Sequence, residues 1–149
     1  MPDLVAAFKS FGHVLYVRHA MTETDYADQV AFKLDDCATQ RVLRDDGWAQ
    51  GKKIGKAIEA WGIEISDVVS SEYCRAWQTA DLAFGHYRMG EGLNFIPTAN
   101  YAVSDISDIK WNVTPFLGER VVAGARIVIG HDDLFEAATG IYPEPQGAA

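Results

Sequence analysis

Four residues that could carry chemistry stand at or shortly after the ends of short apolar runs: Arg18, His19, Arg75 and His131. A guanidinium group offers paired hydrogen-bond donors to the oxygens of a phosphate or a carboxylate. A histidine can act as a nucleophile or a proton carrier near neutral pH. These residue types are therefore suited to binding an anionic group and to transferring it.

The elements that must position these residues are strands separated by helices. Residues 14–17, 67–71 and 126–130 are short, β-prone apolar runs, which predicts buried strands. Residues 44–62 and 73–84 show helical periodicity. Strands that recur with helices between them predict an α/β fold with a parallel sheet, whose crossovers bring the strand ends to one edge. We therefore expect two histidines and at least two arginines in one crevice.

The position of Arg75 also indicates an anion site. The sequence predicts that Arg75 lies in the first turn of the helix at 73–84, with Ser71 as N-cap and Gly85 as the stop. A cation in this turn opposes the helix dipole by roughly 0.3–1 kcal/mol. A bound anion at the same helix end would reverse that effect, so the placement favours a functional role for Arg75.

The rest of the chain is less regular. The other predicted elements are a short helix within 1–12, a fourth strand at 93–96, a helix around 105–113, and a last helix that begins with Asp132 and Asp133 and ends by Gly140. The polar stretch at 21–39 is too long for a simple connection between a strand and a helix. We expect it to form a wall of the crevice.

Four segments together resemble the histidine phosphatase superfamily, whose fold is phosphoglycerate mutase-like. They are the strand followed by Arg-His-Ala at 18–20, the pattern R-x-L-x-x-x-G at 41–47, SSEYCRAWQTA at 70–80, and Gly-His at 130–131. They follow the family's order over almost the whole chain, with Ala20 in place of the usual glycine. The resemblance implies a three-layer α/β/α sandwich with a mostly parallel central sheet, formed by a single domain over residues 1–149. Members commonly carry one more C-terminal strand, so the chain either lacks this strand or ends on an unpaired edge.

The resemblance also implies roles for the candidate residues. It implies that His19 is the nucleophile and forms a phosphohistidine intermediate that water then hydrolyses. The phosphate oxygens would be bound by Arg18, Arg41, Arg75 and His131. The reaction of this family uses no metal ion and no other cofactor.

The proton donor to the leaving group stays open between two interpretations. Asp132 directly follows His131, and this pair resembles the acid phosphatase branch of the superfamily, in which the aspartate protonates the leaving oxygen. An aspartate at a helix start, either Asp132 or Asp133, is also what an N-cap requires. Asp105 and Asp108 lie roughly where mutase-type members place an acidic residue, but no surrounding motif singles out either one.

The expected function is a metal-independent phosphatase that acts on a phosphomonoester or a phosphohistidine, carried by a phosphorylated small molecule or a phosphoprotein. One alternative is a metal-dependent hydrolase whose ligands would be His19, His131, Asp132 and either Asp35 or Asp36. Arginines in the same pocket would repel such a dication. A second alternative is a non-catalytic phospho-ligand binding module, which would have no need of a nucleophilic histidine.

The two cysteines are Cys37 and Cys74, and their spacing alone fits neither a zinc site nor a disulfide framework. Cys37 lies four residues before Arg41, and Cys74 directly precedes Arg75. If both arginines reach one pocket, a disulfide between the cysteines would pin two active-site loops. Two unrelated buried thiols are the alternative, because the geometry that decides between them is invisible in the sequence.

Composition limits the partners and the compartment. The chain has 149 residues, 48% hydrophobic and 23% charged, with a net charge of −8. This charge argues against a nucleic-acid or an anionic-membrane partner. No run reaches the length of a membrane span and no signal peptide is evident, so we expect a soluble protein. As given it would be cytoplasmic, or periplasmic or secreted if a signal peptide was removed. The oligomeric state is not encoded in any motif.

Overall fold

Among the residues that the structure describes, four parallel strands form the central sheet. The computed structural model describes residues 2–10, 12–98 and 100–142. The strands are β1 (His13–Arg18), β2 (Ile65–Ser70), β3 (Arg88–Met89) and β4 (Ala125–Gly130), in the order β1-β4-β2-β3. Each neighbouring pair is parallel, which confirms the prediction from the alternation of strands and helices.

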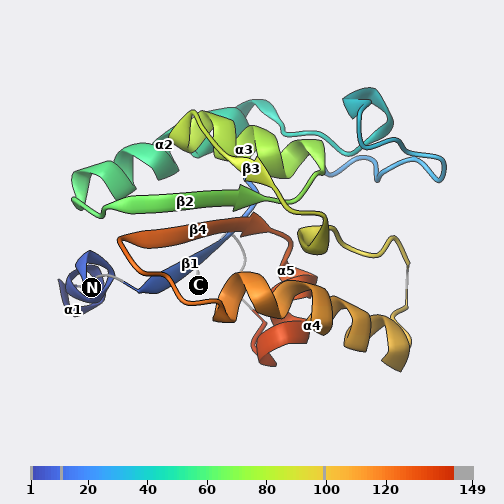
Figure 1. The fold of residues 1–149 in the computed structure, drawn as a ribbon. Coiled ribbons are helices and arrows are strands. Elements are labelled where there is room, and N and C mark those ends of the chain that lie inside the picture. The colour runs from blue at the N-terminus through green and yellow to red at the C-terminus, as the bar shows by residue number, and fades with distance from the viewer. Residues whose placement is uncertain (1, 11, 99, 143–149) are drawn as a thin grey trace.

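The helices of the described residues cover both faces of this sheet. They are α1 (Pro2–Lys9), α2 (Asp45–Ala60), α3 (Cys74–Phe84), α4 (Val103–Gly118) and α5 (Asp132–Thr139). Figure 1 shows α2 and α3 above the sheet and α4 and α5 below it. The predicted three-layer α/β/α sandwich is confirmed.

The apolar core lies on both faces of the central strands. On the side of α2 and α3, Leu15 and Val17 of β1 pack with Ile127 and Ile129 of β4. On the other side, Tyr16 packs with neighbouring strand residues against α4 and α5. Burial on both faces explains why these strands are continuous apolar runs rather than alternating ones.

The register of the sheet aligns the strand ends that carry the candidate residues. Arg18 at the end of β1 pairs with Gly130 at the end of β4, and Ser70 of β2 pairs with Ile129. The residues that follow these strands therefore emerge at the same edge.

The fourth strand lies earlier than the sequence predicts. Residues 93–96 do not pair with the sheet: Glu91–Leu93 is a short 3₁₀ helix, and the paired strand is β3. Leu93 is fully buried in the cluster that contains Val69 and Val128. The apolar character of this segment thus reflects core packing, not strand pairing.

Two helix boundaries also differ from the predictions. Helix α4 extends well beyond residues 105–113. Its fully buried residues are Ile109 and Val113, and Phe116 and Leu117 near its end are partly buried against the core. The N-cap of α3 is Tyr73 and not Ser71. The Oγ atom of Ser71 instead accepts a hydrogen bond from the Tyr73 amide at 3.2 Å. The predicted last helix is confirmed as α5, which ends at Gly140 in the left-handed conformation.

None of the described helices has the length and apolar character needed to cross a membrane. The question of a further strand after α5 concerns residues 143–149, which lie outside the described residues.

Candidate active site

The ends of β1, β2 and β4 bring the predicted histidines together at one edge of the sheet. The His19 amide continues the ladder by donating to the Gly130 carbonyl at 3.1 Å, and the Ser71 amide donates to the Ile129 carbonyl at 2.9 Å. The ring centroids of His19 and His131 are 5.4 Å apart, with the rings edge to face. The predicted convergence of the strand ends thus places two imidazoles side by side.

The imidazole of His19 is held in one tautomer. Its Nδ1 lies 2.9 Å from the Ala20 carbonyl oxygen. A carbonyl can only accept, so Nδ1 carries the proton and the lone pair of the neutral ring is on Nε2. Desolvation by the surrounding protein, followed by the positive charge of Arg75, lowers the pKa of His19 to about 3. His19 is therefore a neutral base with a free Nε2 at physiological pH.

Buried hydrogen bonds connect the segment after His19 to two helices. The Ala20 amide donates to Thr79 Oγ1 at 2.9 Å, and this hydroxyl donates to the Arg75 carbonyl at 2.7 Å, both within buried surroundings. The Met21 amide donates to Gln50 Oε1 of α2 at 2.8 Å. These bonds fix the Ala20 carbonyl that orients the His19 ring.

His131 is buried and bonded on one ring nitrogen. Its Nε2 is 2.9 Å from Ser71 Oγ, and its backbone carbonyl accepts from the Tyr16 hydroxyl at 2.7 Å. Burial and the neighbouring His19, Arg75 and Arg18 lower the pKa of His131 well below its usual value. Both imidazoles are therefore neutral in the free protein.

Arg75 enters the site from the first turn of α3 and is paired with a carboxylate. Its two terminal nitrogens donate to Asp28 Oδ1 at 2.9 Å and Oδ2 at 3.2 Å. Asp28 belongs to the long polar stretch predicted to wall the crevice, and its Oδ1 also accepts from the Arg41 amide at 2.7 Å. The carboxylate occupies the fork geometry that a phosphate would use.

Arg18 and Arg41 complete the cationic part of the site. Arg18 lies 3.3 Å from Asp132 Oδ2, and the Tyr142 hydroxyl donates to the same oxygen at 3.0 Å. Arg41 donates through Nε to the Glu23 carbonyl. Burial and the positive charges of Arg75 and Arg18 lower the pKa of Arg41, so the three guanidinium groups lie close enough to interact. The N-cap of α5 is His131, so the carboxylate of Asp132 does not serve as a cap, and that interpretation was wrong.

Aromatic rings close one side of this cluster. Tyr73, almost fully buried, and Phe95 lie 4.5 Å apart between centroids, and both rings contact His131 at about 5 Å. The guanidinium carbon of Arg75 lies 4.8 Å from the centre of the Tyr73 ring. These rings replace water around the histidine and the arginine, which strengthens electrostatic interactions there.

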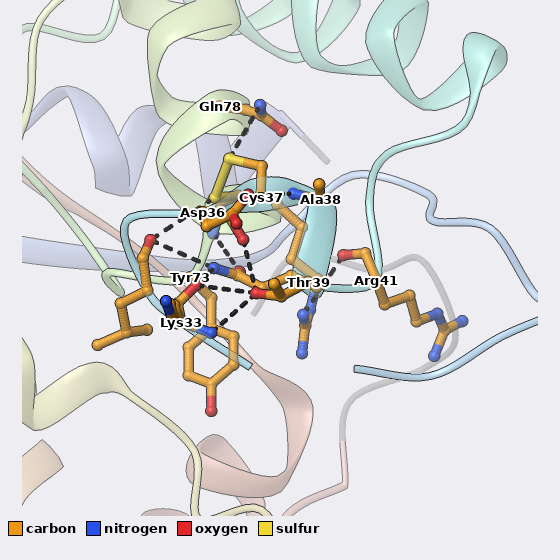
Figure 2. Close-up of a disulfide and its surroundings, with 12 residues drawn as sticks. Lys33, Asp36, Cys37, Ala38, Thr39, Arg41, Tyr73 and Gln78 are labelled. Atoms are coloured by element: carbon orange, nitrogen blue, oxygen red, sulfur yellow. Dashed lines mark hydrogen bonds between the residues drawn. A yellow bond between two sulfur atoms is a disulfide. The ribbon is translucent and has the colours of Figure 1, made fainter. Parts of the chain in front are cut away.

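Cys37 and Cys74 form a disulfide, with their Cα atoms 5.7 Å apart. It joins the loop that leads into Arg41 to the first residue of α3, directly before Arg75, and Figure 2 shows the sulfur pair beside this loop. The buried Gln40 side chain adds a second link. Its Oε1 accepts from the Cys74 amide at 2.9 Å, and its Nε2 donates to the Lys33 carbonyl at 2.7 Å. The loop and the helix that carry two of the arginines are thus held to each other.

A cavity of about 690 Å³ opens beside His19, Arg18 and Arg41. Its inner wall is apolar and is formed by β1, α2 and α1, including Leu15, Ile54 and Phe8. The cationic end and the apolar interior give the cavity two chemically distinct halves.

The metal-hydrolase alternative requires a cluster of metal ligands, and the part of the chain that the structure describes contains none. No group of three or more histidine, cysteine, aspartate or glutamate residues is arranged there to hold an ion. Asp36 instead accepts from the Ala38 amide at 3.1 Å at the short turn after it.

Sequence reasoning missed several residues that shape the site, namely Asp28, Gln40, Ser71, Thr79 and Asn94. The first lies among other acidic residues of a long loop, and the others act through hydrogen bonds to residues distant in the sequence. Nothing in their spacing distinguishes them from surface polar residues.

Comparison with known proteins identifies the fold. No family model and no curated protein sequence matches the chain. Solved structures do match: a protein histidine phosphatase SixA complexed with tungstate has a TM-score of 0.54 and 18% identity, with 90% of this chain and 81% of that chain covered. A phosphoserine phosphatase from Entamoeba histolytica, bound to phosphoserine, has a TM-score of 0.57 and 13% identity over 91% and 87% of the two chains.

A mycobacterial glucosyl-3-phosphoglycerate phosphatase has a TM-score of 0.60 and 13% identity, with 88% of this chain and 81% of that chain covered. At these identities the likeness concerns the fold. The chain has the phosphoglycerate mutase-like fold of the histidine phosphatases, as its sequence segments predicted.

Proposed function

We propose that this protein is a metal-independent phosphatase that forms a phosphohistidine at His19. The observation that carries the proposal is the hydrogen bond from His19 Nδ1 to the Ala20 carbonyl. It leaves the lone pair of a neutral ring on Nε2, which is the atom that must attack phosphorus. The low pKa of His19, about 3, keeps the ring in this reactive form at neutral pH.

The reaction has two steps. In the first, Nε2 of His19 attacks phosphorus, the N–P bond forms, and the bond to the leaving oxygen breaks with both electrons staying on that oxygen. The leaving oxygen takes up the proton of a carboxylic acid of the site, which becomes a carboxylate. In the second, water attacks phosphorus and gives a proton to this carboxylate, the N–P bond breaks, and inorganic phosphate leaves with His19 again neutral. Such a transfer depends mainly on positioning and on positive charge around the equatorial oxygens.

Positive charge is provided by Arg18, Arg41 and Arg75, with His131 as a further contact to the phosphate. Arg75 is already oriented by the Asp28 carboxylate, so a phosphate would share with Asp28 a guanidinium whose conformation is fixed. These roles are supported by the convergence of the arginines on His19, whose pKa responds to Arg75 and Arg18.

We assign the proton donor to Asp132. Its carboxylate lies beside Arg18, at the end of the strand that leads to His19, and it is not used as a helix cap. A carboxyl group at this place would lie close enough to the leaving oxygen to give it a proton.

The substrate class is a phosphomonoester or a phosphohistidine, in a small molecule or a phosphoprotein. Similar solved structures are named as a protein histidine phosphatase and a phosphoserine phosphatase, which supports both classes. A panel of phosphorylated sugars, nucleotides, phosphopeptides and a phosphohistidine protein identifies which is preferred.

Trapping of the phosphoenzyme tests the proposal. Wild-type protein denatured in detergent at alkaline pH during turnover should contain a phosphoryl group that is stable in base and labile in acid, as expected for a phosphohistidine. His19→Ala should contain none and should lose phosphatase activity. His86→Ala, which alters an exposed histidine, is the matched control and should behave as wild type. Normal turnover by His19→Ala would show that His19 is not the nucleophile.

A further inference from the structure

A chain of hydrogen bonds behind His131 has a fixed direction. It begins at the Glu72 backbone amide, which donates to Asn94 Oδ1 at 2.8 Å. The Asn94 amide nitrogen donates to Glu72 Oε2 at 2.7 Å. A backbone N–H can only donate and a carboxylate accepts, so these two bonds identify which end of the Asn94 amide is oxygen.

The single hydroxyl proton of Ser71 is assigned by its neighbours. Ser71 Oγ lies 3.0 Å from Asn94 Oδ1, which can only accept. It lies 3.2 Å from the Tyr73 amide, which can only donate. The Ser71 proton must therefore point to Asn94, because two oxygens at this distance without a proton between them would repel each other.

This assignment determines the tautomer of His131. Since the Ser71 proton is used for Asn94, the His131 Nε2 at 2.9 Å must carry its own proton and donate it to Ser71 Oγ. The lone pair of the neutral ring is then on Nδ1. Among the described residues no group bonds to this Nδ1, and it is not one of their enclosed, unpartnered atoms. It is therefore not sealed off by the described residues, on a ring that packs edge to face against His19 with centroids 5.4 Å apart.

Because the two rings lie edge to face, a phosphate bound at His19 as proposed would meet lone pairs on both His19 Nε2 and His131 Nδ1. A phosphate dianion would meet His131 Nδ1 with an oxygen that also has only lone pairs. We infer that the site binds the monoanion of the phosphate group, whose P–OH donates a hydrogen bond to His131 Nδ1, and that Ser71 and Asn94 are positioning residues that impose this choice. The inference rests on the proposed phosphate site at His19.

The surroundings of the ring keep the proton on the phosphate. The charged and titratable groups around it are His19 and Arg18 at the end of β1, Arg75 and Tyr73 at the start of α3, and Asp132 on α5. Burial and the first three of these lower the pKa of His131, so the imidazole is a poor competitor for the shared proton. The ring accepts the hydrogen bond and stays neutral.

The tautomer is tested directly by ¹⁵N chemical shifts of histidine-labelled protein without any ligand. We expect the protonated nitrogen of His131 to be Nε2 in wild type. In Asn94→Ala the Ser71 hydroxyl loses its acceptor and can turn to donate to His131, which allows the Nδ1–H form. The exposed Asn112→Ala is the matched control and should keep the wild-type shifts. A wild-type His131 protonated on Nδ1 would overturn the inference.

Proton uptake on binding tests the consequence, with inorganic phosphate as the probe. Calorimetry at about pH 8, where the ligand is mostly a dianion, in buffers of different ionisation enthalpy should give about one proton taken up per site. Uptake should vanish at about pH 5, where the ligand already carries the proton. Asn94→Ala should lower the proton uptake at about pH 8. If Asn94→Ala folds poorly, Ser71→Ala replaces it and should have the same effect.

The outcomes separate this inference from the proposed function. Uptake near zero in wild type, or unchanged in both variants, overturns the role of the relay even if the enzyme turns over substrate. Asp132→Asn should keep the full uptake, and its loss there would assign the proton to Asp132 and overturn the role of His131. Phosphate binding with uptake but without any phosphoenzyme would support the relay and reject catalysis at His19.

Discussion

Removal of the disulfide between Cys37 and Cys74 should cost stability in an amount set by the loop that it closes. The cysteines are 37 residues apart in the sequence. The chain-entropy relation for a loop of this length gives about 4 kcal/mol of stabilisation through the unfolded state. For a chain of this size that corresponds to a fall in melting temperature on the order of 10 °C. Cys37→Ala/Cys74→Ala should unfold at a correspondingly lower urea concentration.

Urea unfolding followed by circular dichroism measures this effect. The proteins compared are oxidised wild type, wild type with reductant, and the double variant with and without reductant. Reductant should shift only wild type, toward the midpoint of the double variant. Intact mass before and after alkylation verifies that non-reduced wild type has no free thiol. Equal urea midpoints for the double variant and oxidised wild type would refute the entropic reasoning.

The same variant separates stability from positioning. The disulfide and Gln40 both connect the loop of Arg41 to the start of α3, directly before Arg75. Well below the melting temperature, loss of the bond should therefore raise KM more than it lowers kcat, because substrate contacts loosen while His19 stays held by Ala20 and Thr79. A fall in kcat without a rise in KM would contradict this, because it would show that the disulfide affects the chemical step and not substrate binding.

Three further predictions concern the chemistry of the site. Stability should fall as the pH is lowered from about 6.5 toward 3, because unfolding lets His19 and His131 regain their ordinary pKa and bind protons; His19→Asn should weaken this dependence in urea titrations and the exposed His86→Asn should not. Asp132→Asn should slow hydrolysis of alkyl phosphates by roughly 10²–10⁴-fold while sparing nitrophenyl phosphate; an unchanged ratio of the two rates would remove the general-acid assignment. Activity should survive chelators and be inhibited by vanadate or tungstate, and a loss in EDTA that a divalent metal restores would favour a metal hydrolase.

Local sequence signals were sufficient for the elements that carry the site. The strands that end at Arg18 and Gly130 were recognisable because burial on both faces requires continuous apolar runs. Helix α3 was recognisable from its small packing residues and from Gly85, which adopts the left-handed conformation where the helix stops. Since parallel strands place their carboxyl ends at one edge, the meeting of His19 and His131 followed from these elements.

The hydrogen-bond partners of the site could not be predicted in the same way. Ser71 and Asn94 are 23 residues apart, and Ser71 and His131 are 60 apart. The hydrogen bond between Ser71 and Asn94 depends on the segment around Leu93, which the sequence predicted to be a strand. A buried leucine occurs in strands and in packed loops alike, so its apolar character did not distinguish them. Asp28 likewise lies in a long loop with several acidic residues, and only the closed loop shows which carboxylate reaches Arg75.

The arginines of the candidate site would allow an acidic chain to bind the proposed phosphate. The net charge of the chain is −8. Within the site, Arg18 pairs with Asp132 and Arg75 pairs with Asp28. Each carboxylate holds its guanidinium in a fixed conformation before a ligand arrives, which lowers the entropic cost of binding. A phosphate would then share Arg75 with the Asp28 carboxylate, which repels it. A monoanion suffers less of this repulsion than a dianion, so the charge balance of the site and the lone pair on His131 favour the same protonation state of the substrate.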